Sequence, residues 1–114
     1  MNEKMIINLT PHEVTLVRGT EKLILPACET PARVEEKLEK AGNIAGYDIF
    51  RKKFGKTTNL PDENLDTIYI VSRIVAEANT ERTDIFVPEG TFRDETGRII
   101  GARALATLAP GYIK

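Results

Sequence analysis

Residues 66–88, "DTIYIVSRIVAEANTERTDIFVP", decide the fold of this chain. The apolar run Ile68–Val71 predicts a buried strand, and Ser72 after it is typical of a helix N-cap because its hydroxyl can accept from an early backbone N–H. The following apolar residues recur at helical spacing, and Asp84–Pro88 predicts a second short strand ended by its proline. This order predicts a right-handed βαβ crossover, although the link is so short that the two strands need not be direct neighbours.

The residues before this unit predict strands and one ambiguous segment. Short apolar runs at 4–10, 13–19 and 22–26 are strand-like, and Gly19 opens a hairpin connection between the last two. Residues 31–42, "PARVEEKLEKAG", fit a helix through Glu and Lys four apart, but their apolar residues also share one face of a strand. We favour a long, partly exposed hairpin with residues 47–55, followed by a loop over 56–66.

The C-terminal third predicts one more hairpin. A strand around Phe92-Arg93 and a strand from Arg98 to Leu105 flank the turn 94–97. Gly101 inside the last strand indicates a β-bulge or a close backbone approach. The predicted fold class is therefore α/β, with residues 1–114 as a single sheet-dominated domain that has a mixed sheet, one βαβ unit and hairpins.

Composition narrows the classes of function. The net charge of −1 comes from 16 basic and 17 acidic residues, so the basic excess typical of general nucleic-acid binding is missing. One histidine and one cysteine, Cys28, make a zinc site or a disulfide within one chain improbable, and we expect no metal and no cofactor. No apolar run approaches the ~20 residues of a membrane span. The first ten residues lack a signal-peptide layout, so we expect a cytoplasmic protein.

Polar groups cluster where the predicted strands end. A proline after Thr10 stops the first strand and sets Asn8, Thr10 and His12 at its end. Ser72 and Arg73 follow the strand of the βαβ unit, and Pro88 ends the other strand. Ligands on open α/β sheets bind outside the carboxyl ends of parallel strands, so these residues predict an anion-binding site. The alternative is structural: a turn at Thr10, a cap at Ser72 and solvated side chains at Arg73 and His12.

Arginine residues of the last third form a second candidate group. Their guanidinium forks suit bidentate contacts with phosphate or carboxylate. Pairing with the nearby carboxylates of Asp84, Glu89, Asp94 and Glu95 is the alternative. The four arginines are Arg82, Arg93, Arg98 and Arg103.

Three stretches of the sequence resemble a family of small, mostly uncharacterised proteins of bacteriophages and prophages. The stretches are "INLTPHEV", "DTIYIVSRIVAEA" with "RTDIFVP", and "FRDETGRIIGARAL". Members open with a similar Asn-Leu-Thr-Pro-His motif and end with a similar Arg-Asp-x-x-Gly-Arg hairpin. Many have a cysteine near position 102, where this chain has Ala102, and its absence argues against a thiol mechanism. The residues that match the pattern are Asn8, Thr10, Pro11, His12, Ser72, Arg82, Pro88, Arg93, Asp94, Gly97 and Arg98.

The resemblance implies an accessory protein acting in the cytoplasm of an infected or lysogenic bacterium. By analogy with unrelated phage proteins that sequester nucleotide-derived immune signals, we expect a homo-oligomer that binds a small anionic ligand such as a cyclic nucleotide. Two alternatives stay open. One is a protein-binding inhibitor without a small ligand, and the other is a phosphodiesterase-like enzyme that uses His12. We lean toward a binder that is not an enzyme, with neither membrane nor bulk nucleic acid as a partner.

Overall fold

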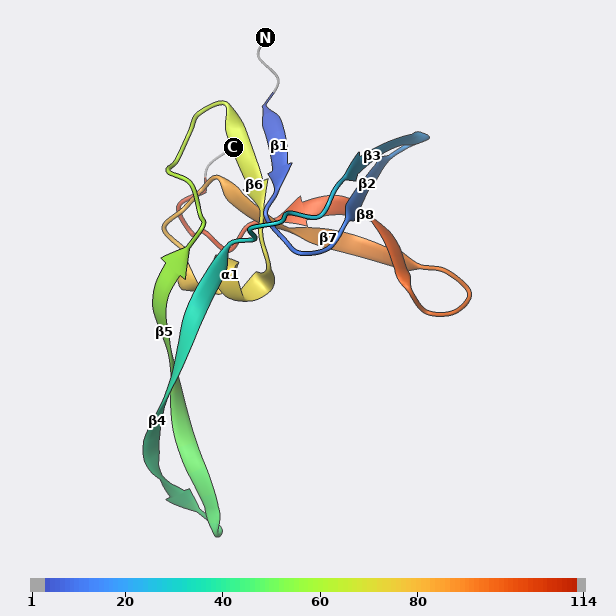
Figure 1. Ribbon diagram of the computed structural model, residues 1–114. Helices are drawn as coiled ribbons and strands as arrows, with labels where there is room; N and C mark the ends of the chain where they lie inside the picture. The colour runs from blue at the N-terminus through green and yellow to red at the C-terminus, as the bar shows by residue number, and fades with distance from the viewer. Residues whose placement is uncertain (1–3, 113–114) are drawn as a thin grey trace.

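The computed structural model describes residues 4–112, and Figure 1 shows a sheet-centred body from which one long hairpin projects. The elements in chain order are β1 (Met5–Asn8), β2 (Val14–Arg18), β3 (Glu21–Leu25), β4 (Arg33–Ile44), β5 (Tyr47–Thr58), β6 (Thr67–Ile70), α1 (Arg73–Ala78), β7 (Ile85–Arg93) and β8 (Ile99–Ala106). The predicted dominance of strands, with one short helix, is confirmed.

Six strands form a mixed sheet in the order β1-β6-β7-β8-β2-β3. The pairs β1–β6, β6–β7 and β2–β8 are parallel, whereas β7–β8 and β2–β3 are antiparallel. β6 and β7 are direct neighbours, although α1 and two short connections are all that join them. The two-residue turn Gly19-Thr20 joins β2 to β3, as predicted, and Gly19 has a φ of 62°.

The hydrophobic core lies between one face of the sheet and α1. Val71 and Val75 are almost fully buried and pack with Tyr69, Ile85 and Val87 from β6 and β7. These strand residues alternate in sequence with residues that point to the opposite face, as the pleat of a strand requires. The helix therefore covers only one side of the sheet, and no helix among residues 4–112 covers the other side.

Strand β7 does not end at Pro88, which corrects the sequence prediction of two separate strands. Phe86 points its backbone carbonyl toward β6, where it accepts from Val71 N at 2.9 Å. Because backbone groups alternate between the two edges of a strand, Pro88 points to the same side as Phe86. β6 ends at Ile70, so no strand lies beside Pro88 on that edge, and the absence of a backbone N–H on Pro88 breaks no ladder hydrogen bond. β7 therefore continues to Arg93, with Pro88 opposite Leu105 of β8.

The segment 33–58 forms the arm, an antiparallel hairpin of β4 and β5 that projects from the body in Figure 1. The preference for a hairpin is confirmed, and the alternative of a helix ending at Gly42 is wrong. Ala45 and Gly46 connect the strands with φ values of 53° and 87°, the positive values that a tight hairpin turn needs. The predicted loop over 56–66 is shorter than expected, since β5 continues to Thr58.

The hairpin of β7 and β8 has the predicted irregularity near Gly101. Phe92 pairs with Gly101 and Arg93 pairs with Ile99, so Ile100 is an extra residue in β8. A Cβ on Gly101 would lie 2.7 Å from Cζ of Phe92, so the backbone approaches this ring closely. β8 runs from Ile99 to Ala106, one residue later than predicted at both ends.

The molecule is elongated because of the arm. The Cα radius of gyration is 16.8 Å, whereas a compact chain of this length would have roughly 13 Å. Within residues 4–112, no helix is long and apolar enough to cross a membrane. The expectation about a signal peptide rests partly on residues 1–3, which lie outside the described residues.

Replacing Gly101 tests the close approach to Phe92. We expect Gly101→Ala to lower the free energy of unfolding by about 1 kcal/mol, at the low end of overpacking costs because the half-buried Phe92 ring can shift. Urea denaturation measures this change. Gly111→Ala is the matched control, since its new Cβ meets no atom within 4 Å. Equal stability of the two variants would contradict the packing described for Gly101.

Candidate ligand-binding groove

Asn8 and Thr10 at the end of β1 bind each other and the loops around them. Asn8 is buried, and its Oδ1 accepts from Thr10 N at 3.0 Å and from Thr10 Oγ1 at 2.7 Å. Asn8 Nδ2 donates to the carbonyl oxygens of His12 at 2.7 Å and Pro26 at 3.0 Å. Both oxygen lone pairs and both amide hydrogens are therefore used.

We call this arrangement the Asn8 clasp, comprising Asn8, Thr10 and the backbone of residues 9–12. Around it, Leu9 N donates to Ile70 O and Cys28 N donates to Thr10 O, at 2.8 and 2.9 Å. The clasp thus ties β1, the end of β6 and the 26–32 connection together. Its geometry supports the structural alternative for Asn8 and Thr10. The side chain of His12 is exposed, and the hydrogen bonds that His12 makes to described residues use its backbone.

The parallel pairing of β1 with β6 brings the clasp beside Ser72, as the sequence predicted for adjacent strand ends. Ser72 occupies the N-cap position of α1, but its side chain makes no capping hydrogen bond, so the predicted hydroxyl cap is wrong. Arg73 Nε lies 3.3 Å from Glu77 Oε2 in an exposed ion pair one helical turn away. α1 has only six residues, which makes it a weak anion site on its own.

Arg82 is held by a carboxylate of the same chain. Its Nε and one terminal nitrogen each lie 2.8 Å from an oxygen of Asp84, and the same terminal nitrogen donates to Pro61 O. The side chains of Arg82 and Asp84 are only 16% and 8% exposed. The hydrogen bond with Asp84 raises the pKa of Arg82 above its usual value. The fork of Arg82 is therefore occupied, as the pairing alternative predicted for this arginine.

Arg93 and Arg98 lie at the far tip of the β7–β8 hairpin, and Pro88 lies within β7. Arg93 donates to Gly97 O at 2.6 Å across the tip. Asp94 organises the turn, because its Oδ1 accepts from Thr96 Oγ1 at 2.7 Å and from the backbone N of Arg98 at 3.1 Å. The Thr96 hydrogen bond lowers the pKa of Asp94. The structure thus separates these residues from the Asn8 clasp instead of gathering them into one site.

The sheet face opposite α1 has its own apolar surface. Ile68, Phe86 and Leu105 come from three adjacent strands, β6, β7 and β8, and the register places them on the side away from Tyr69 and Val87. Instead of a helix, two hollows lie along this face. Both are lined by Lys4 and Leu105, so they adjoin each other.

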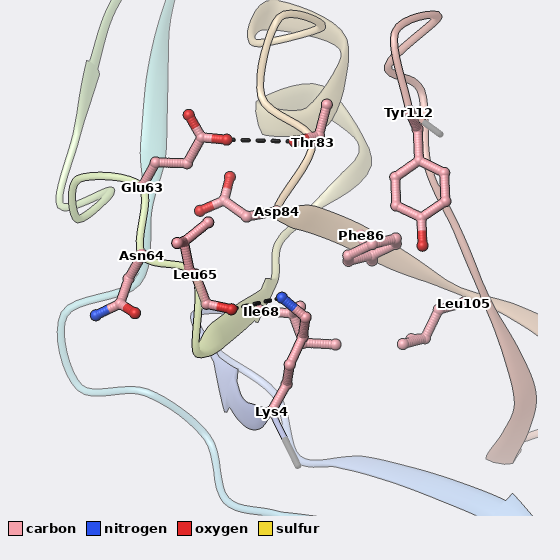
Figure 2. Close-up of a pocket in the computed structure, with 10 residues that line it drawn as sticks. All are labelled: Lys4, Glu63, Asn64, Leu65, Ile68, Thr83, Asp84, Phe86, Leu105 and Tyr112. Atoms are coloured by element: carbon pink, nitrogen blue, oxygen red, sulfur yellow. Dashed lines mark hydrogen bonds between the residues drawn. The ribbon is translucent and has the colours of Figure 1, made fainter. Parts of the chain in front are cut away.

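The smaller hollow, shown in Figure 2, has a volume of about 440 Å³. Tyr112 stands over Phe86 with the ring centroids 5.8 Å apart and the rings nearly perpendicular. Lys4 Nζ donates to Leu65 O at 2.6 Å on one wall, and Thr83 Oγ1 donates to Glu63 on the opposite side. Glu63 and Asp84 place carboxylates here, which makes this hollow unfavourable for an anion.

The larger hollow, which we call the groove, has a volume of about 820 Å³ between β1, β2, β3 and β8. Its charged side chains are four basic residues and one acidic residue, Glu21, and Glu21 already pairs with Arg18 at 3.3 Å. Arg103 places its guanidinium carbon 4.2 Å from the centroid of the Phe92 ring, a cation–π contact that orients it. The lining residues are Lys4, Ile6, Leu16, Val17, Arg18, Glu21, Lys22, Leu23, Leu25, Arg103, Ala104 and Leu105.

The groove contains only one residue that the sequence analysis singled out, Arg103. Lys4, Arg18 and Lys22 are not among the predicted site residues, because that prediction rests on the strand ends and on the arginine-rich last third. A signal was present: Arg18 and Lys22 flank the predicted β2–β3 turn, and Lys4 precedes the first strand. What the sequence could not show is that β8 lies beside β2 and brings Arg103 to them.

Comparison with models of protein families, with curated proteins and with solved structures finds no match to this chain. Among residues 4–112, no group of three or more His, Cys, Asp or Glu side chains lies close enough together to hold a metal ion.

Replacing Asn8 tests the clasp. Asn8→Ala should lower the free energy of unfolding by about 1–3 kcal/mol, because the buried Thr10 loses its partner and two partly buried hydrogen bonds to backbone carbonyls are lost. Urea denaturation followed by circular dichroism gives the change. His12→Ala is the control and should stay within about 0.5 kcal/mol of the unsubstituted protein, because its side chain is exposed. Similar losses for both variants would contradict the clasp.

Replacing Arg82 tests the Arg82–Asp84 pair. Arg82→Met keeps much of the side-chain volume but leaves Asp84 buried without its cation, so we expect a loss of about 3 kcal/mol or more. Arg73→Met removes an arginine whose ion pair is largely exposed, and should cost less than about 1 kcal/mol. Thermal and urea unfolding of both variants decide the point. A mild effect of Arg82→Met would show that the pair is not structural.

Proposed function

We propose that this protein is a non-enzymatic binder that holds a small anionic ligand of the nucleotide type in the groove. The observation that supports this most is the local charge. Of the four basic residues that line the groove, Arg18 pairs with Glu21 and Lys4 Nζ donates to a backbone carbonyl. Lys22 and Arg103 make no ion pair with a described residue, so they leave two cations beside apolar surface in a chain whose net charge is −1. Because cations are concentrated here and not over the whole surface, the groove attracts a small anion without attracting bulk nucleic acid.

The dimensions and chemistry of the groove suit such a ligand. A volume of about 820 Å³ lies within the usual range of small-molecule sites, roughly 300–1,000 Å³. Lys22 and Arg103 would bind phosphate oxygens, and the stacking of Arg103 on Phe92 keeps its fork from collapsing onto the floor. Val17 shares its face with Lys22, and Leu105 shares its face with Arg103, so these two offer apolar surface for a ribose or base.

The resemblance to phage proteins supplies a biological setting for this proposal. A protein that binds a nucleotide-derived immune signal and does not turn it over would act by sequestration in the cytoplasm of the infected host. We further propose that β6, α1 and β7 form a βαβ unit of the α/β class. In this chain that unit serves as the scaffold, whereas the ligand lies on the sheet face that α1 leaves uncovered.

An enzymatic alternative has less support from the geometry. His12, the one histidine of the chain, belongs to the loop of the Asn8 clasp and is not among the residues that line the groove. A general acid or base has to reach the reacting group within hydrogen-bond distance. His12 would need a second copy of the chain to bring it to a ligand bound in the groove.

The test begins with native mass spectrometry of protein purified from bacterial cells, followed by calorimetry with ADP-ribose, cyclic ADP-ribose and cyclic dinucleotides. We expect at least one of these anions to bind, with an affinity that falls as salt increases. Lys22→Glu should weaken that binding about tenfold or more, because a charged contact becomes a repulsion.

Lys56→Glu is the matched control, with the same change of charge at an exposed position outside the groove. It should leave the affinity unchanged. Equal weakening by the two variants would mean that only overall charge matters, and no binding across the panel would refute the proposal. Conversion of a cyclic nucleotide to a linear product that stops in His12→Ala would favour the enzyme instead.

A further inference from the structure

The arm leaves apolar side chains in water along its length. Leu38, Phe50 and Phe54 are 61%, 50% and 45% exposed, and the tip residues Ile44 and Tyr47 are 66% and 75% exposed. A two-stranded hairpin alone is only marginally stable in water. Contacts with α1 involve the base of the arm, where Val34 packs against the core. The outer part of the arm therefore lacks a partner within the described chain.

The two faces of the arm differ in chemistry. On one face Glu39 lies between Arg51 at 3.1 Å and Lys53 at 3.0 Å, so the charges there satisfy one another. The register places Leu38 opposite Lys52, and the rows on either side pair Glu36 with Phe54 and Lys40 with Phe50. Because alternate residues share a face, these six residues lie together, and we call this surface the arm face.

The arm face is complementary to itself. Leu38 lies near the middle of β4, which runs from Arg33 to Ile44. Consider a second copy packed face to face on the arm face, related by a two-fold axis that lies in the interface, perpendicular to the strands, at Leu38. The two β4 strands then run antiparallel, one over the other, and Glu36 lies over the other copy's Lys40. In the same arrangement Phe54 lies over the other copy's Phe50. Lys52 lies over Lys52 of the other copy, and each of the two can extend its long side chain past the rings to water.

The tip of the arm completes the interface. A ribbon of 12 residues per strand is about 40 Å long, so one face buries roughly 400 Å² per copy, whereas stable interfaces bury about 800 Å² per partner. An antiparallel overlay centred on Leu38 carries the tip of each arm to the base of the other, beside the body. By the same alternation Ile44 and Tyr47 lie on the opposite face of the arm, so they add contact area only where the tip meets the body of the other copy.

We propose that the arm face binds the arm face of a second copy of this chain, forming a two-fold dimer centred on Leu38. Lys40 Nζ also lies 3.4 Å from Asp48 Oδ1 of the same copy, so in the dimer Lys40 is shared between Asp48 and the partner's Glu36. This proposal does not depend on the groove, since none of the six residues of the arm face lines it.

Charge reversal tests the pairing by sedimentation of the full chain across a concentration series. The unsubstituted protein should dimerise. Glu36→Lys and Lys40→Glu should each weaken dimerisation about tenfold or more, because each variant sets like charges against each other twice per dimer. A mixture of the two variants should dimerise again, since Lys at 36 then faces Glu at 40 and Lys40 faces Glu36. The chain with both substitutions should also recover.

Lys37→Glu is the matched control, because it makes the same change on the opposite face of the same strand. It should dimerise like the unsubstituted protein. Circular dichroism of each variant checks that the sheet is intact, and recovery in the mixture shows that each single variant is folded. A monomer at tens of micromolar, a dimer that neither single variant weakens, or equal weakening by Lys37→Glu would overturn the proposal.

Discussion

The buried amide of Asn8 is the interaction on which the arrangement of the chain depends. It accepts from Thr10 and donates to backbone carbonyls in two separate connections, at His12 and Pro26. The backbone around it is bonded to the end of β6 and to the start of the arm, where Ala32 N donates to Leu9 O at 3.0 Å. One polar side chain thus fixes where the chain leaves the sheet, where it returns and where the arm begins. A buried amide is so costly to leave unpaired that these contacts act as a unit.

The sequence predicts the elements of this fold well and their assembly less well. The strand-helix-strand segment 66–88, the β2–β3 hairpin and the bulge near Gly101 follow from local patterns. Pro88 was misread because a proline stops a central strand but not one whose neighbour has already ended, and sequence does not show where β6 ends. The arm was a close choice, since Glu36 and Lys40 suit a helix, and its strand pairing depends on contacts with β5.

The candidate site was predicted less well than the fold, for a physical reason. Asn8, Thr10 and Arg82 have the residue types of a binding site, but their hydrogen bonds are satisfied within the chain. The groove instead comes from a sheet order in which β8 lies between β7 and β2, bringing Arg103 toward Lys22. Its charge is also hidden in the composition, because acidic residues elsewhere bring the total to −1. Only the sheet topology shows that basic residues gather in the groove while the charges of the whole chain nearly balance.

The most direct test of the central claim is amide chemical-shift mapping by NMR during titration with ADP-ribose. The groove account predicts that the largest changes occur at Ile6, Lys22, Leu23 and Ala104, which line the groove on three different strands. Changes concentrated at Thr10, His12, Ser72 and Arg73 would contradict it and would return the site to the carboxyl ends of β1 and β6.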